Sequence, residues 1–178
     1  MRVFWSKGFD GTSLSDLTAA TGVSRPSLYL AFGNKEALFK KALERYARDK
    51  LAFIDRAIEA PTARSVAETL LRGMLALVAS DSDPKGCLGV NNLVACGAEA
   101  EPIRAEILTR TLAIKDSLTG RFERAQRAGE HLPCAGPAAL AAFLIAILQG
   151  MALQAASGAS PQELATLVDT SLERWPAA

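Results

Sequence analysis

The sequence predicts an all-α protein of about nine helices, and three observations support that fold class. Apolar residues recur every three or four positions through most of the chain, which is typical of amphipathic helices. Clusters of Gly, Pro and Asn separate these segments, and no run alternates apolar and polar residues for long enough to predict a strand. With 178 residues, of which 49% are hydrophobic, the chain is long enough to bury a core. We expect a small N-terminal domain over residues 1–46 and a larger helical domain over 47–178.

The N-terminal domain opens with two short helical segments. Residues 1–7 carry three apolar side chains in a row and are expected to end a first helix. A second helix starts at Thr12 or Ser13, because Ser13 and Asp16 have the spacing of a capping box, in which each side chain satisfies a free backbone N–H. Gly22 is expected to end this helix, since glycine readily adopts the left-handed conformation of a C-terminal cap.

The third helix is short and the later ones are longer. It covers residues 24–30, where Pro26 is tolerated because a first turn loses no backbone hydrogen bond. Asn34 caps a fourth helix that we predict to run to about residue 59. The helices expected in the larger domain have apolar stripes or turn boundaries at 66–78, 88–96, 103–122, 137–156 and 161–175.

Charge is distributed unevenly, although the net charge is only +1. Residues 1–50 contain nine Lys or Arg and five Asp or Glu, which is a net charge of +4. The rest of the chain contains eleven and fourteen, which is a net charge of −3. A basic N-terminal part on a mildly acidic body is the asymmetry expected of a protein that meets phosphate at one end.

Catalytic and metal-binding patterns are not visible in the sequence. Cys87, Cys96 and Cys134 form no CxxC pair, so we predict neither a disulfide framework nor a zinc site, and a reducing cytoplasm is the expected compartment. His131, the only histidine, has no carboxylate or cysteine at metal-binding spacing and is expected in an exposed loop. We therefore expect no metal, no cofactor and no enzymatic activity.

One segment raises the possibility of a membrane span. Residues 132–162 contain no charged side chain, which makes the segment long and apolar enough to cross a bilayer. Its Gln149 and Gln154, its many alanines and the lack of basic clusters at its ends favour a helix buried on several sides, for example at a subunit interface.

Two short helices joined at Gly22 and Val23 predict a helix-turn-helix, whose second helix presents its N-terminal residues to the DNA major groove. Arg25 has the geometry to donate two hydrogen bonds to guanine or to a phosphate, and the Ser27 hydroxyl suits either partner. The small core behind these helices is expected to consist of Leu14, Leu17, Val23, Leu28 and Phe32.

The run GFDGTSLSDLTAATGVSRPSLYLAFGNKEALFKKAL, with the aromatic residues before it, resembles the DNA-binding head of the TetR family of transcriptional regulators over residues 3–45. The resemblance implies a homodimeric repressor that binds a near-palindromic operator and is released by a small hydrophobic effector. Leu30 and Ala31 depart from the family pattern, because they stand where an aromatic residue or histidine is frequent, which removes a possible DNA contact. The residues expected at the DNA are Thr12, Ser13, Ser24, Arg25, Pro26, Ser27, Tyr29 and Lys35.

Effector binding is expected within the larger domain. Asn91 and Asn92 lie in an apolar segment, where a buried amide needs a partner that a ligand could supply; alternatively, both amides face solvent. Cys87 and Cys96 are interpreted as small core residues, with thiol oxidation sensing as the alternative. The residues expected around an effector are Phe53, Met74, Val78, Cys87, Asn91, Asn92, Ile107 and Ile114.

The last two helices of each subunit are expected to pair as a four-helix bundle in the homodimer, since small residues would let the backbones approach. An alternative is a ligand-binding helical protein with a head that does not function. The residues predicted at the dimer interface are Ala139, Ala142, Phe143, Ala146, Ile147, Gly150, Leu164, Leu167, Val168, Leu172 and Trp175.

Overall fold

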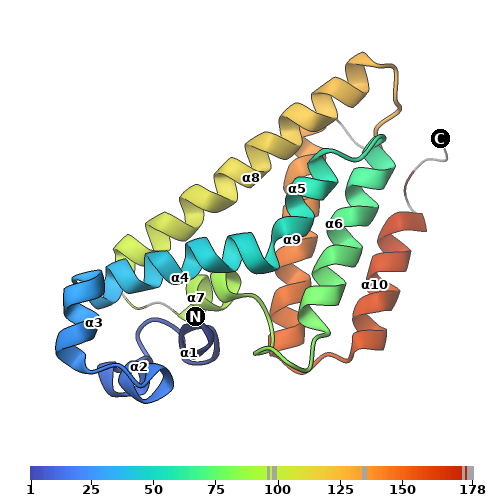
Figure 1. The fold of residues 1–178 in the computed structure, drawn as a ribbon. Coiled ribbons are helices and arrows are strands. Elements are labelled where there is room, and N and C mark those ends of the chain that lie inside the picture. The colour runs from blue at the N-terminus through green and yellow to red at the C-terminus, as the bar shows by residue number, and fades with distance from the viewer. Residues whose placement is uncertain (96, 98–99, 134–135, 174, 176–178) are drawn as a thin grey trace.

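The computed structural model describes residues 1–95, 97, 100–133, 136–173 and 175, and within them the chain forms ten helices and no strand (Figure 1). The all-α fold class is therefore confirmed. Figure 1 shows α1, α2 and α3 together at one end of the molecule, with α6, α9 and α10 side by side at the other. The helices are α1 (Arg2–Lys7), α2 (Leu14–Thr21), α3 (Arg25–Phe32), α4 (Lys35–Lys50), α5 (Ala52–Ile58), α6 (Ala63–Val78), α7 (Leu88–Ala95), α8 (Glu101–Arg127), α9 (Pro137–Ala156) and α10 (Pro161–Glu173).

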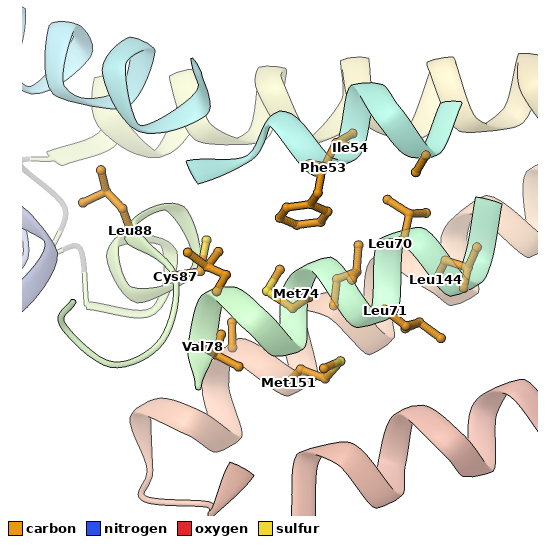
Figure 2. Close-up of a cluster of buried hydrophobic side chains, with 14 of the residues drawn as sticks. Phe53, Ile54, Leu70, Leu71, Met74, Val78, Cys87, Leu88, Leu144 and Met151 are labelled. Carbon is orange, nitrogen blue, oxygen red and sulfur yellow. The ribbon is translucent and has the colours of Figure 1, made fainter. Parts of the chain in front are cut away.

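The predicted fourth helix is two helices, which is why the count is ten rather than about nine. Its break lies at Leu51, whose φ of −103° and ψ of 8° leave the helical region. The bend lets α5 pack closely on α6: a Cβ atom on Gly73 would lie 2.4 Å from the Phe53 ring (Figure 2). Apolar spacing continues across a one-residue bend, so periodicity alone does not reveal it.

Aromatic side chains join the N-terminal helices to α4. Phe4 and Trp5 of α1 are buried, and their rings lie edge-on to Phe39 at 5.0 Å and to Tyr46 at 4.8 Å. The first helix is thereby fixed against the long helix that leads into the body.

The head's own core is smaller than predicted. Leu17 and Leu28 are buried and Leu14 is half-buried, but Val23 is 39% exposed and Phe32 is 36% exposed. Assigning those two side chains to the core was wrong, because Val23 sits in the turn and Phe32 in the last turn of α3, where three short helices provide no cover.

Helix α9 is long and apolar enough by composition to cross a membrane. In the fold it packs against α6, α7, α8 and α10, and Leu140, Leu144 and Met151 on it are fully buried. Figure 2 shows Leu144 and Met151 facing the side chains of α6. One face of α9 is therefore part of the body's core.

Candidate nucleic-acid interface and body cavity

Helices α2 and α3 form the helix-turn-helix that the sequence predicted. Gly22 has φ 69° and ψ 6°, a left-handed conformation that favours glycine and allows the chain to turn within three residues. The Ser13 hydroxyl caps α2 by accepting from the Asp16 N–H, and the Ser24 hydroxyl caps α3 by accepting from the Ser27 N–H. The local sequence thus determines where both helices begin.

The start of α3 is a continuous exposed surface. Ser24, Arg25, Pro26 and Ser27 are all exposed, and Tyr29 is exposed one turn further on. The Arg25 guanidinium donates a 2.9 Å hydrogen bond from Nη2 to the Ser15 hydroxyl of α2, which orients the cation across the turn. Helix α3 contains no acidic residue, so this surface is suited to an anionic partner.

Lys35 lies at the start of α4, beyond the other end of α3. Its ammonium is 4.4 Å from the centre of the Phe9 ring, a cation–π contact that positions the charge. Lys35 and Tyr29 border the same small hollow behind α3. The structure therefore brings six of the eight predicted DNA-binding residues to the α3 end of the head.

Thr12 and Ser13, the remaining two, lie at the start of α2. Thr12 is 1% exposed and its hydroxyl donates to the Gly8 carbonyl at 2.6 Å, so the prediction of a DNA contact by this side chain was wrong. Ser13 is exposed, but its N–H and hydroxyl both donate to the Asp16 carboxylate.

The carboxylate of Asp16 occupies the N-terminus of α2. A 2.6 Å hydrogen bond from the Lys7 ammonium, followed by the bonds from Ser13, lowers the pKa of Asp16 to about 2. The carboxylate is thus charged at neutral pH, and a phosphate at this helix end would meet a negative charge. Ser13 stays a predicted contact at the edge of the surface.

The body contains a partly open cavity of about 310 Å³ between α4, α5, α6, α7, α8 and α9. Met74, Cys87, Ile107 and Ile114, four of the eight residues predicted around an effector, line it. Other lining residues are Leu43, Tyr46, Ala47, Leu51, Ile54, Gly89, Val90, Leu93, Arg110, Thr111, Ala113, Ile145, Leu148 and Gln149.

Phe53 and Val78 do not line the cavity. Both side chains are buried in the packed cluster between α5, α6 and α7 that Figure 2 shows beside Met74 and Cys87. Their expected ligand contact is corrected to a core role, because helical spacing marks an inward face without distinguishing a filled interior from a cavity.

Asn91 and Asn92 also lie outside the cavity wall, on the side of α7 that faces the head. Asn92 is 0% exposed; its Oδ1 accepts from the Phe9 N–H at 2.7 Å and its Nδ2 donates to the Leu88 carbonyl at 2.8 Å. Asn91 Nδ2 donates to the Lys85 carbonyl at 3.0 Å. Backbone groups are the hydrogen-bond partners of both amides, and only the Asn92 amide is fully shielded from solvent.

Tyr46 is a cavity residue that the sequence reasoning missed. It is 1% exposed; among the described residues its hydroxyl makes no hydrogen bond of full geometry, and the Cys87 thiol and the Leu88 backbone are its polar neighbours. Burial raises the pKa of this phenol, so the hydroxyl stays neutral and able to donate. The sequence offered no signal for this role, because Tyr46 falls on the apolar stripe of its helix like any core aromatic residue.

Helix α9 presents an exposed apolar face. Ala139, Ala142, Phe143 and Ala146 are exposed, with Phe143 at 52%, and Ile147, Gly150 and Leu167 are half-buried. Leu153, which was not predicted, extends the face by another turn.

Four residues predicted at the dimer interface are buried inside the protomer instead. The apolar stripe of α10 packs against α6 of its own chain, and Arg64 of α6 donates a 3.1 Å hydrogen bond to the Leu172 carbonyl. A buried side chain has no surface left for a partner subunit, so this part of the prediction was wrong. The four residues are Leu164, Val168, Leu172 and Trp175.

The described residues contain no group of three or more His, Cys, Asp or Glu side chains arranged to hold a metal ion. His131 is exposed, as expected. Cys96 and Cys134 lie outside the described residues.

Comparison with known proteins agrees with this architecture. The model of bacterial regulatory proteins of the tetR family matches residues 1–42, and the model of the tetracyclin repressor-like C-terminal domain matches residues 68–171. The chain belongs to the TetR family of transcriptional regulators.

Named relatives extend over nearly the whole chain. The HTH-type transcriptional repressor ComR of Escherichia coli (strain K12) is 35% identical over an alignment of 180 positions that covers 99% of this chain and 85% of ComR. The HTH-type transcriptional repressor DhaR of Mycobacterium sp. (strain GP1) is 29% identical over 86% of this chain and 76% of DhaR. A cysteine mutant of the regulator CifR, solved in complex with 26-base-pair operator DNA, superimposes with a TM-score of 0.91 at 32% identity and covers 98% of this chain and 92% of that one.

Proposed function

We propose that this protein is a homodimeric, cytoplasmic repressor that binds a near-palindromic operator and is released by a small hydrophobic effector. The observation that carries the proposal is the exposed start of α3, where Arg25, Ser27 and Tyr29 surround a helix end without acidic residues. The operator complex of the relative CifR supports the same use of the same fold. A helix-turn-helix surface of this kind inserts into the major groove, with Tyr29 and Lys35 directed at phosphates.

Dimerisation through the exposed face of α9 would place two heads in successive major grooves, one helical turn apart. The face carries small side chains, the alanines at positions 139, 142 and 146, so that two copies of α9 can approach closely. Phe143 and Leu153 supply the apolar area that an isolated protomer leaves in water.

The cavity in the body supports the proposal that a small molecule binds there as the effector. Its wall is largely apolar, and the buried Tyr46 hydroxyl makes no hydrogen bond of full geometry with its neighbours, the Cys87 thiol and the Leu88 backbone. A molecule with an apolar body and one hydrogen-bond acceptor would accept a hydrogen bond from this hydroxyl. An anionic molecule would lose its hydration on entering without gaining an opposite charge, because Arg110 is already paired with Glu106 at 2.7 Å.

Release of DNA requires the effector to favour a second conformation. Helix α7 connects the two regions: Gly89, Val90 and Leu93 line the cavity, while Asn92 bonds to the backbone at Phe9 in the head. A ligand that displaces α7 would therefore change the position of the head and mismatch the spacing of the two grooves.

The proposal is tested by selecting binding sites from a pool of random duplexes with the purified dimer, at two salt concentrations. We expect an enriched near-palindrome whose affinity falls steeply with salt, because several phosphate contacts release counterions. Failure to enrich any sequence, with weak binding at both salts, would contradict the repressor and favour a ligand-binding protein with a head that does not function.

Filling the cavity with a larger side chain is expected to weaken the effector response without weakening operator binding. Ile114→Trp places a larger ring in the wall, so we expect operator binding within about twofold of the original while an effector found by screening loses at least about tenfold in potency. The matched control is Leu112→Trp, on an exposed position of the same helix, which should leave the effector response unchanged. Operator release measured against effector concentration gives both values; equal potency in both variants would place the effector elsewhere.

Thiol oxidation is a second candidate for the release signal, and the position of Cys87 favours it. This thiol lies in the cavity wall, so a small oxidant that enters the cavity reaches it although the residue is buried. Hydrogen peroxide would convert the thiol to a sulfenic acid and leave as water. We expect peroxide to lower operator affinity in the original protein and not in Cys87→Ser; release that persists in Cys87→Ser and disappears in Cys96→Ser would exclude Cys87 as the sensor.

A further inference from the structure

Leu30 on α3 is an apolar side chain in an unexpected position. It is 91% exposed, more than any other large apolar side chain of the described residues; the next, Val94, is 69% exposed. Exposure of this degree on a protein surface leaves almost the whole side chain in water, so a partner that covers it gains apolar burial.

Helical geometry determines where Leu30 points. Leu28 is buried against the head's core, and Leu30 follows two residues later, about 200° around the helix axis. Pro26 precedes Leu30 by four residues and therefore lies on the same face, one turn nearer the start of α3. Both are exposed, so Pro26 and Leu30 form an apolar pair on the face of α3 that points away from the core.

Polar groups border this pair. Ser27 follows Pro26 directly, and Arg25 is oriented by its hydrogen bond to Ser15 on α2. Figure 1 places α3 at the outer end of the head, and Ser27 and Arg25 are exposed on this helix together with the pair.

We propose that Leu30, with Pro26 beside it, recognises the C5-methyl groups of thymines in the operator. The inference rests on the proposed DNA-binding function and deepens it by naming what α3 selects. The thymine methyl is the apolar group that a base pair presents in the major groove, while cytosine presents an amino group at the neighbouring position. A leucine side chain buries apolar area against the thymine methyl, whereas cytosine carries only hydrogen at C5, so the covered methyl discriminates thymine from cytosine.

The proposal assigns different tasks to neighbouring residues of α3. Arg25 and Ser27 supply hydrogen bonds to base edges or phosphates, and Leu30 supplies specificity without any hydrogen bond. Leu30 stands where the family pattern has an aromatic residue or histidine. The sequence pattern indicated that this difference removes a DNA contact; in the proposal, a methyl contact by Leu30 takes its place.

The test removes the methyl and nothing else. In the operator found by selection, each thymine is replaced in turn by deoxyuridine, which keeps every hydrogen-bonding group, and affinity is measured for the original protein and for Leu30→Ala. At one thymine position per half-site we expect the original protein to lose about fourfold, and about fifteenfold when both half-sites are changed, as expected for uncovering one methyl group at each. Leu30→Ala should bind the thymine operator more weakly and lose nothing further with deoxyuridine.

Two further variants complete the design. Leu112→Ala removes an exposed leucine from α8, outside the head, and should keep the full deoxyuridine effect. Leu30→Val keeps part of the apolar surface and should keep part of the effect.

The outcomes distinguish a failure of methyl recognition from a failure of the proposed repressor function. A tightly bound operator that tolerates deoxyuridine at every position, or a deoxyuridine effect that persists in Leu30→Ala, overturns methyl recognition and leaves the repressor intact. A selection that enriches no operator overturns the repressor and methyl recognition together.

Discussion

Replacing Ala146 by glutamate is expected to convert the dimer to monomers and to weaken operator binding by more than about 100-fold. Ala146 lies near the middle of the exposed face of α9, with Ala139 and Ala142 on one side and Gly150 on the other. A two-fold interface would bring both glutamates into the same apolar surface. Burying each unpaired carboxylate there costs several kcal/mol, which opposes dimerisation. Binding two half-sites as one unit then fails, because each head is left with a single half-site.

The measurement is sedimentation equilibrium or mass photometry, followed by operator titration at one salt concentration. Ala105→Glu on α8 makes the same chemical change at an exposed position outside this face and should leave both the dimer and the affinity unchanged. An Ala146→Glu protein that stays dimeric and binds normally would show that α9 is not the interface.

Replacing Asn92 by leucine is expected to lower the free energy of unfolding by about 2–4 kcal/mol, the range for leaving buried polar groups without partners. The substitution keeps a similar volume but removes the acceptor of the Phe9 N–H and the donor to the Leu88 carbonyl. The Asn92 amide also donates to the Phe4 carbonyl at 3.4 Å, so α7 loses its hydrogen bonds to two points of the head at once.

Urea denaturation gives the stability change, and effector titration of the operator complex gives a second, independent measurement. We expect the concentration of effector needed for release to rise, because α7 no longer transmits its displacement to Phe9. Asn91→Leu is the comparison: that amide is only half-buried and its bond to Trp5 is 3.5 Å long, so we expect a smaller loss of about 1 kcal/mol. Equal stability of Asn92→Leu and the original protein would contradict a structural role for the Asn92 amide.

Much of the head was predictable because its signals are local. Ser13 with Asp16, Ser24, and Asn34 determine where three helices begin, since a side chain that bonds an N–H three residues on depends on nothing distant. Gly22 ends α2 for an equally local reason, the freedom of glycine to adopt a positive φ. These short-range rules are sufficient to predict a helix-turn-helix and its exposed face.

The fold class, most helix starts and the head could therefore be predicted from local sequence alone. Which apolar surfaces meet became visible only in the folded protein: α10 packs on its own α6, so Leu164 and Val168 are core, while Phe143 of α9 is left exposed. The structure likewise showed that Asn92 bonds the head, that Tyr46 faces a cavity and that Leu30 faces outward. Apolar periodicity predicts that a helix face must be covered, but the segment that covers it depends on contacts between residues far apart in the chain.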